Sequence, residues 1–376
     1  MNIDYAFLIE QHRHFIEKVL FHDKLRFPLL CLSSRARKVK KAYTAIGGEA
    51  DNREREFSYL AELSDDICRN ACYRLLNKLL HDFSDVVHRC KYGNDYRKIK
   101  QEMQKVGKQY LSVVCIIKNE ARYISEWIAY YKMMGVDHIY LFNNGSTDNI
   151  EEVLKKYVQS GYVTLLKFNG ANAQLPLYRL TLRALRKTSR WIAYIDADEF
   201  VLPREGTLRE YMQTQEKHPG IGINWIVYGT GGHVERPEGL VTENYLLTFE
   251  DRNNLLNLRI KAIVNPKEVY DMASPHFCVL KNGKFVVDED GEEITAKWMY
   301  VSGSGPAFTG ENKTKKIRIN HYWTKSEQDL REKSNRGYAA GGFNPDFENI
   351  MKRIDYPQMV DETIIKYVAR IKEEMM

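Results

Sequence analysis

The chain has 376 residues, a formal net charge of +6, and 44% hydrophobic and 28% charged residues. This composition is ordinary for a globular protein, and the length exceeds the ~250–300 residues at which single cores stop growing, so we expect one main domain with appended elements. The six cysteines include no C-x-x-C pair, which disfavours both a disulfide framework and a structural zinc site. Lys and Arg are concentrated early, but no zinc-finger spacing or RNP-like aromatic pattern accompanies them, so nucleic acid is not expected as a partner.

The first thirty residues are interrupted by charges such as Glu10, Arg13 and Lys18, which excludes an unbroken signal-peptide core. No stretch approaches the ~18 apolar residues needed to span a bilayer. We therefore expect a cytoplasmic protein. The basic clusters at 35–41 and 91–108 fit a solvated helix face or linker. Alternatively they attract a phosphate-bearing acceptor or anionic lipid at the inner face of the membrane, where each Lys or Arg adds about 1 kcal/mol, so peripheral membrane association stays open.

The N-terminal third has the pattern of helices. Apolar positions recur at helical spacing from Tyr5 to Phe27 and again from Leu60 to Val87, with a polar, basic connection between the two segments. The pattern predicts a helical N-terminal extension over residues 1–109.

From Leu111 the pattern changes to strands that alternate with helices. Strands are predicted at 111–117, 136–142, 162–168 and 191–195, as is typical of parallel βαβ units covered on both faces. Ligands of such open sheets bind beyond the carboxyl ends of the strands, and the polar segments 118–120, 143–148 and 196–199 all lie at that edge. We expect a main domain over 110–340 and a C-terminal helical tail over 341–376.

The apolar strand at 191–195 leads directly into Asp196, Asp198 and Glu199. Successive side chains of an extended segment point to opposite faces, so Asp196 and Asp198 should share one side. Mg²⁺ and Mn²⁺ prefer such oxygen ligands and commonly complete their shell with water and substrate phosphate oxygens. A site for a metal and a diphosphate, as in a nucleotide-sugar transferase, is the first hypothesis. The alternative is a capped strand end with solvated acids, because short acidic motifs are frequent.

Four motifs occur in order along the main domain: Lys-Asn-Glu at 118–120, Asn-Asn-x-Ser-x-Asp at 143–148, Asp-x-Asp-Glu-Phe at 196–200 and Asn-His-Tyr at 320–322. With them, the chain resembles GT-A fold glycosyltransferases over about residues 110–340, and most resembles the family-92 group, a relative of family 2. The resemblance implies an α/β fold, with a Rossmann-like, nucleotide-sugar-binding mixed sheet flanked by helices. The N-terminal hundred residues match nothing in that pattern. Animal members carry a membrane anchor that is not expected here, which points to a bacterial surface-glycan enzyme.

Residue by residue, the resemblance implies a nucleotide pocket and a donor-facing helix. Glu120 and Asp148 could instead cap helices, and Arg179 could simply be exposed. The implied pocket residues are Lys118, Asn119, Glu120, Asn144 and Asp148, with Gln174 and Arg179 where the helix meets the donor.

The resemblance also implies that Asp196 and Asp198 bind Mn²⁺ or Mg²⁺ and thereby the two phosphates. His321 would supply another metal contact, although a lone His is more often structural. Lys325 and Arg336 would balance the charge of the departing diphosphate, or else belong to a solvated helix.

The implied reaction is attack of an acceptor hydroxyl on the anomeric carbon of a UDP sugar, with inversion, in surface polysaccharide or lipopolysaccharide synthesis. The acceptor would be a glycan or glycolipid. A general base must reach its hydroxyl within about 2.6–3.2 Å, and the candidates are Glu250, Asp251 and His233, with His276 as a further alternative.

Two other classes of protein remain open. One is a non-catalytic module that binds a nucleotide sugar or glycan. The other is a metal-dependent nucleotidyltransferase, which should carry a Gly-rich basic loop after its first strand, where this chain has Lys-Asn-Glu at 118–120.

Overall fold

The computed structural model describes residues 5–17, 53–69, 71–295, 307–336 and 346–376. The basic cluster at 35–41 therefore lies outside the described residues. None of the described helices is long and apolar enough to cross a membrane.

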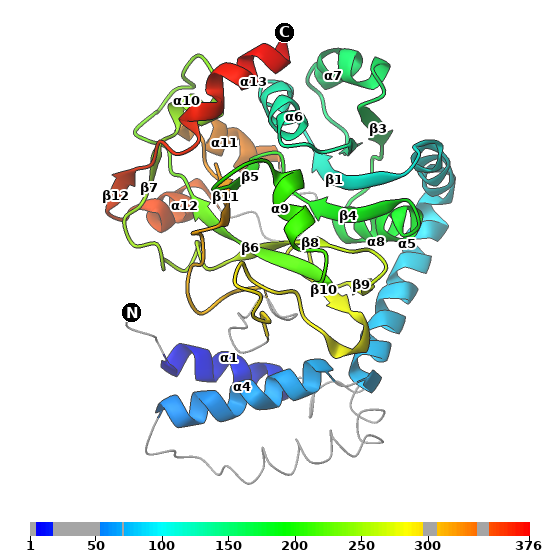
Figure 1. Cartoon of the computed structure of the whole chain (residues 1–376), viewed down its shortest axis with the longest axis vertical. Coiled ribbons are helices and arrows are strands. Elements are labelled where there is room, and N and C mark those ends of the chain that lie inside the picture. The colour runs from blue at the N-terminus through cyan, green and yellow to red at the C-terminus, as the bar shows by residue number, and fades with distance from the viewer. Residues whose placement is uncertain (1–4, 18–52, 70, 296–306, 337–345) are drawn as a thin grey trace.

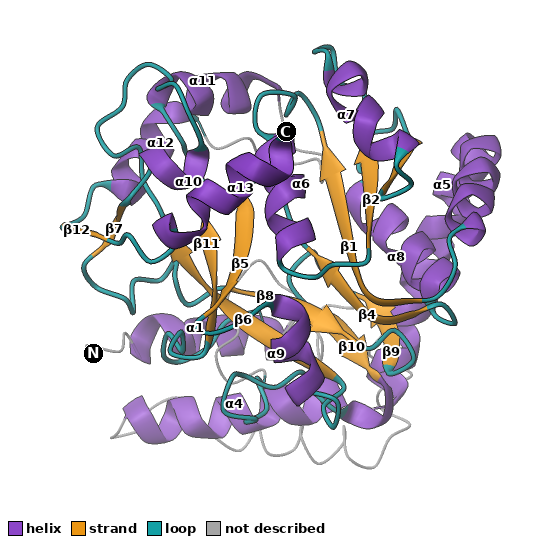
Figure 2. Ribbon diagram, turned by 45° about the horizontal axis from the view of Figure 1, so that its top comes forward, coloured by secondary structure: helices purple, strands orange, loops and turns teal. Residues whose placement is uncertain are grey.

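One eight-stranded sheet runs through the main body, in the order β3-β2-β1-β4-β8-β6-β11-β5 (Figure 2). Strands β1 to β4 are parallel, β8 is antiparallel to both β4 and β6, and β11 is parallel to β6. The carboxyl ends of β1, β2, β4, β6 and β11 therefore meet at one edge, where the antiparallel β8 and β5 begin. The bounds are β1 (Gln109–Ile117), β2 (His138–Asn143), β3 (Val163–Lys167), β4 (Ser189–Tyr194), β5 (Glu199–Pro203), β6 (Gly220–Val227), β8 (Ile260–Val264) and β11 (Ile317–His321).

Helices cover both faces of this sheet because its strands alternate their apolar side chains. Leu111, Val113 and Cys115 of β1 belong to a core with α6 (Ile124–Met133), α7 (Ile150–Gln159) and α13 (Val368–Met375), whereas Val114 packs with α5 (Ala71–Lys105) and α8 (Gln174–Leu185) on the other face. This layered mixed sheet confirms the predicted α/β fold class. Smaller elements complete the body: α9 (Leu208–Thr214), α10 (Val241–Asn244), β7 (Leu247–Phe249), β9 (Val269–Met272), β10 (Cys278–Leu280), α11 (Glu327–Arg336), α12 (Phe347–Ile354) and β12 (Gln358–Val360).

The N-terminal helices α1 (Tyr5–Glu17) and α4 (Arg53–Arg69) lie side by side below the body, and α5 runs along its flank (Figure 1). His12 Nδ1 lies 2.7 Å from Ser64 Oγ and links the first two helices. Asp85 of α5 is fully buried and accepts hydrogen bonds from Arg179 and Arg183 of α8. Helices α1, α4 and α5 fall within the predicted N-terminal extension, and residues 18–52, which include the end of the helical pattern predicted for 5–27, lie outside the described residues. The division into an extension over 1–109, a main domain over 110–340 and a tail over 341–376 stays a prediction.

Candidate active site

The loops that follow β1 and β2 are joined by reciprocal hydrogen bonds. Asn119 adopts a positive φ of 55°, and its Oδ1 accepts a 2.7 Å hydrogen bond from Thr147 N. Ser146 Oγ accepts from Asn119 N at 3.0 Å, and Asp148 Oδ2 accepts from Ala121 N at 2.8 Å. Two of the predicted pocket residues, Asn119 and Asp148, therefore shape this edge of the sheet by fixing one loop against the other.

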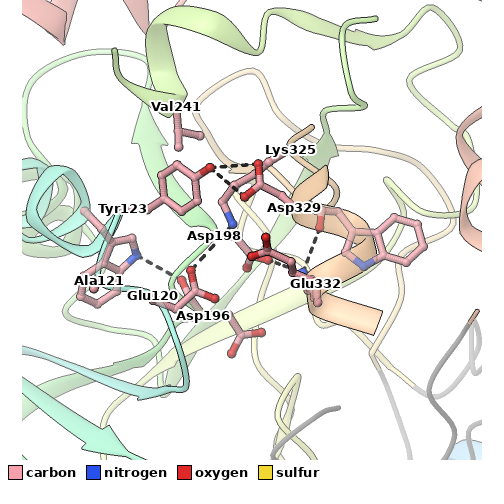
Figure 3. Close-up of polar contacts among 12 residues, drawn as sticks. Glu120, Ala121, Tyr123, Asp196, Asp198, Val241, Lys325, Asp329 and Glu332 are labelled. Atoms are coloured by element: carbon pink, nitrogen blue, oxygen red, sulfur yellow. Dashed lines mark hydrogen bonds and ion pairs between the residues drawn. The ribbon is translucent and has the colours of Figure 1, made fainter. Parts of the chain in front are cut away.

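Glu120 and Lys325 meet in the same region although 205 positions separate them in the chain. The Lys325 Nζ lies 3.9 Å from a carboxylate oxygen of Glu120 and 4.8 Å from the ring centre of Tyr123 (Figure 3). Both charged residues are under 10% exposed. The hydroxyl of Tyr123 donates to Asp329 of α11, so the loop after β1 and the start of α11 hold this pair in place. Lys118 is half-buried beside Asn119 on the same loop.

Asn144 lies on the β2 loop but contacts the loop after β3. Its Nδ2 donates a 3.1 Å hydrogen bond to the carbonyl of Gly170, while its backbone N donates to the carbonyl of Ile117. The three loops after β1, β2 and β3 are therefore connected through this one amide residue.

The two aspartates stand in a turn between β4 and β5, rather than in an extended segment. Glu199 N donates to the carbonyl of Asp196 at 3.1 Å, which closes the turn. Asp196 Oδ2 is 2.7 Å from Lys261 Nζ of β8, whereas Asp198 Oδ2 is 2.6 Å from Lys333 Nζ of α11. The expected extended geometry was wrong here because the chain reverses within four residues, and each acid has a lysine of its own.

Asp198 lies next to His321, the last residue of β11. Asp198 Oδ1 is 3.6 Å from His321 Nε2, and the Asp198 carbonyl accepts a 2.8 Å hydrogen bond from Tyr322 N. Burial acts to raise the pKa of Asp198, but the charges of Lys333 and His321 outweigh it and hold that pKa well below the usual range. Burial lowers the pKa of His321, against the attraction of Asp198. Asp198 is therefore ionised at neutral pH, with Lys333 as its nearest fixed cation.

These two groups fit a divalent metal better than the predicted set of three. Across the described ranges, no group of three or more His, Cys, Asp or Glu side chains is placed to hold a metal ion. Asp198 and His321 do suit one ion, since donors bound at about 2.1 Å to the same metal lie within about 4 Å of each other. His321 Nε2 is the nitrogen that faces Asp198, whereas His321 Nδ1 is buried and has no hydrogen-bond partner among the described residues. Asp196, directed to Lys261, is not gathered with them.

Lys261 is a fully buried cation beneath the acidic turn. Its Nζ lies 3.5 Å from the equally buried Glu199 carboxylate, whose other contact is a 2.8 Å hydrogen bond from Asp196 N. Burial alone would lower the pKa of Lys261, but Asp196 and Glu199 raise it above its usual value. Burial raises the pKa of Glu199 to about 8, against the attraction of Lys261. Lys261 therefore places a fixed positive charge at the edge where β8 begins.

Gln174 and Arg179 are placed differently from the other pocket residues. Gln174 begins α8, and its Nε2 lies 3.4 Å from Tyr178 Oη. Arg179 is only 3% exposed, and its guanidinium donates to the Met272 carbonyl and to Asp85. Arg179 therefore links α8 to α5 and β9, and its hydrogen bonds do not reach Asp196 or Asp198, contrary to the predicted place at the donor.

Glu250 and Asp251 line a separate pocket of about 300 Å³ beside Tyr356 and Pro357. Asp251 Oδ1 accepts a hydrogen bond from Asn253 N within its own turn.

His233 lies near the start of α11. Its Nε2 is 3.4 Å from the Asn244 carbonyl, its ring packs on Tyr245, and its own carbonyl accepts from Glu327 N. Arg336 ends α11, and its side chain lies outside the described residues. The roles of His233, Glu250 and Asp251 as bases stay predictions.

Sequence reasoning missed the roles of Lys261 and Lys333. Lys261 carried one signal, a single charge within the apolar run Ile-Lys-Ala-Ile-Val at 260–264. Lys333 carried none, because it stands among the many charged residues of α11 and only the tertiary structure places it on Asp198.

The sheet edge thus brings together the paired loops, a buried carboxylate beside an imidazole, and the buried side chains of Lys261 and Lys325. The sequence profile of glycosyltransferase family 92 matches residues 111–334, more than half of the chain, and the protein belongs to this family.

The chain is similar to a glycosyltransferase family 92 protein of Oryza sativa, with 31% identity over 140 residues, which cover 36% of this chain and 24% of that protein. It is also similar to one of Ricinus communis, with 25% identity over 170 residues, which cover 42% of this chain and 29% of the relative. The alignments thus span under a third of the length of these curated relatives.

Among solved structures, TarS residues 1–349 of S. aureus matches 42% of this chain and 47% of its own, with 13% identity and a TM-score of 0.27. The same protein in complex with UDP matches with 11% identity and a TM-score of 0.29.

Proposed function

We propose that the protein transfers a sugar from a UDP sugar to a hydroxyl of a glycan or glycolipid acceptor, with inversion at the anomeric carbon and with Mn²⁺ or Mg²⁺ bound. Family membership supports the transferase class. The observation that carries the proposal is the Asp198–His321 pair, 3.6 Å apart at the sheet edge where the loops after β1 and β2 meet. A role of the protein in surface polysaccharide or lipopolysaccharide synthesis stays a prediction.

In this proposal Asp198 and His321 hold the metal, which would neutralise charge on the leaving diphosphate. Lys333 contacts Asp198 and the Trp323 carbonyl, which fixes the carboxylate so that Oδ1 faces the imidazole. Lys325 adds a second, largely buried cation next to the loop after β1. Fixed charges in a site of low dielectric stabilise developing negative charge without reorganisation, so both lysines would favour departure of UDP.

The nucleotide would occupy the pocket bordered by the loops after β1 and β2. Glu120 is the carboxylate there that can accept from ribose hydroxyls, and Asn144 is an amide with a carbonyl oxygen left to accept from a base edge. Asn119 and Asp148 would act on the donor indirectly, by holding the two loops together.

The acceptor hydroxyl must lose a proton as its oxygen bonds to the anomeric carbon and the bond from that carbon to the phosphate oxygen breaks. Glu250, Asp251 and His233 remain the proposed bases, and replacing each by its amide or by Gln tests them one at a time.

The test is a donor screen with UDP sugars, with and without Mn²⁺, on the wild-type chain and on Asp198→Asn. We expect UDP release that depends on the metal and falls on the order of 100-fold in the variant. Asp290→Asn is the matched control, because Asp290 is an exposed acid paired with Lys316 and should leave turnover unchanged.

Binding of UDP sugar without any turnover would indicate a binding module, and release of pyrophosphate would indicate a nucleotidyltransferase. Equal turnover in wild type and in a folded Asp198→Asn variant would refute the metal assignment.

A further inference from the structure

An apolar stripe is exposed along the first half of α5. Leu75, Leu79, Phe83, Val86 and Val87 are 49%, 54%, 69%, 46% and 56% exposed. Their spacing places them on one face of a helix, over about 18 Å at 1.5 Å per residue. Contiguous exposed apolar side chains of this kind mark an interaction surface.

The opposite face of the same helix packs on the body of the protein. Asp85 is fully buried against Arg179 and Arg183, and further along the helix Tyr96 and Ile99 are buried in the core with α8. The stripe therefore lies on the face of α5 opposite to the one that packs on the sheet domain.

Positive charge is concentrated in the second half of α5, beyond the kink at Tyr92 that follows the stripe. The sequence of α5 contains eight Lys or Arg residues against four acids, one of which is the buried Asp85. In the second half of the helix, Arg97, Lys98 and Lys100 are exposed. A second copy of the chain would bring this excess of like charge against itself, whereas an anionic surface would complement it.

The stripe ends beside the candidate active site. Just beyond Val87, His88 Nε2 lies 3.3 Å from the Ala171 carbonyl, and the His88 ring stacks on Phe168. This is the loop after β3, whose Gly170 carbonyl accepts from Asn144 at the donor edge. A surface bound to the stripe would thus lie close to the mouth of the site.

We propose that α5 docks the protein on an anionic lipid surface, with the stripe from Leu75 to Val87 entering the headgroup region and the exposed lysines and arginines of α5 contacting the phosphates. The docking rests on the proposed function only in its purpose, which is to present a lipid-linked acceptor to the site. The surface itself stands on the exposure and charge of α5.

Sedimentation of the full chain with vesicles tests the proposal, using phosphatidylcholine with and without phosphatidylglycerol. We expect binding to the anionic vesicles that weakens with salt. The double variant Leu79→Ser and Phe83→Ser should lower the partition coefficient on the order of 10-fold or more. Replacing Arg97, Lys98 and Lys100 by Gln should lower binding to anionic vesicles by a similar factor and leave the weak binding to neutral vesicles unchanged.

The matched control is Val158→Ser with Ile365→Ser, two apolar residues 40% and 39% exposed on other elements. This control should bind vesicles like the wild type. UDP release with a water-soluble acceptor should be unchanged in the stripe variant, so a failure of the transferase proposal is seen there and not in the vesicle assay.

Three results would overturn the docking proposal. The first is wild-type protein that stays in the supernatant with anionic vesicles. The second is a stripe variant whose Tm falls well below that of the control, which would mean that another segment of the chain covers Phe83. The third is a wild-type dimer in light scattering that the stripe variant converts to a monomer.

Discussion

Replacing Lys261 by Met tests the buried charge cluster beneath the acidic turn. Lys261 and Glu199 are both 0% exposed, and the lysine is the cation that faces Glu199 at 3.5 Å. Above about pH 8, where Glu199 is ionised, removing one partner of this buried ion pair costs about 3–5 kcal/mol, because the remaining charge is left without compensation. With an unfolding entropy of about 2.1 cal/mol/K per residue, a chain of this length should lose about 4–6 °C in Tm.

The double variant Lys261→Met with Glu199→Gln isolates the cause. An uncharged amide at position 199 needs no cation, so most of the lost stability should return, and the difference between single and double variants measures the coupling. Lys284→Met is the control, since Lys284 is 51% exposed and 3.6 Å from Glu268, and exposed pairs contribute about 0–1 kcal/mol.

The stability lost in the Lys261→Met variant should depend on pH. Burial raises the pKa of Glu199 to about 8, above its value near 4.5 in the unfolded chain, so the stability contributed by its protonated form is complete below about pH 4.5 and is lost as the pH rises through 8. The loss caused by Lys261→Met should therefore grow with pH, and the double variant should not show this growth. Thermal unfolding followed from about pH 5 to about pH 9, the range in which Glu199 titrates, gives both results. A double variant as unstable as the single one would refute the pairing.

Two further replacements test other parts of the fold. Asp361→Asn should cost about 3–5 kcal/mol in urea unfolding, because both carboxylate oxygens accept from Arg318 at 2.8 and 2.9 Å. Burial acts to raise the pKa of Asp361, but Arg318 holds this pKa well below its usual value. The stabilisation by the ion pair is therefore present above about pH 4 and is lost as the pH falls. Parallel acid-unfolding curves of the wild type and the variant would contradict this pH dependence. Gly170→Ala should lower the free energy of unfolding by about 1–3 kcal/mol, because its Cβ would lie 2.3 Å from the Phe168 ring. Gly107→Ala is the control and should leave the Tm unchanged, because its Cβ would meet nothing within 4 Å. Equal Tm values for the two variants would refute the argument.

Much of the sheet was predictable because its strands are short apolar runs between polar loops. The alternation in β1 determined its two buried faces, and the polar segments at 118–120 and 143–148 followed from the ends of consecutive parallel strands. The antiparallel insertion of β8 between β4 and β6 was not predictable. Strand pairing over such sequence separations depends on packing partners, which local periodicity does not contain.

Arg179 shows why a residue on the right helix can have a different role. The sequence of α8 places it near the expected donor edge, but its partner Asp85 comes from α5, nearly a hundred positions earlier. Nothing in either segment alone indicates the pairing, since an arginine on an amphipathic helix is usually exposed. The ion pair appears only when α5 packs on α8 and removes both groups from water.

The candidate metal site also depends on contacts between distant segments that the sequence does not indicate. Counting Asp196, Asp198 and His321 from the sequence gives three candidate ligands, but the described residues bring no three such side chains together around one position. Lys261 on β8 faces Asp196 at 2.7 Å, while Asp198 presents one oxygen to Lys333 and its other oxygen to His321. In the proposed metal site, Asp198 and His321 would therefore be the two protein ligands, and substrate phosphates and water would complete the coordination, as Mg²⁺ and Mn²⁺ prefer.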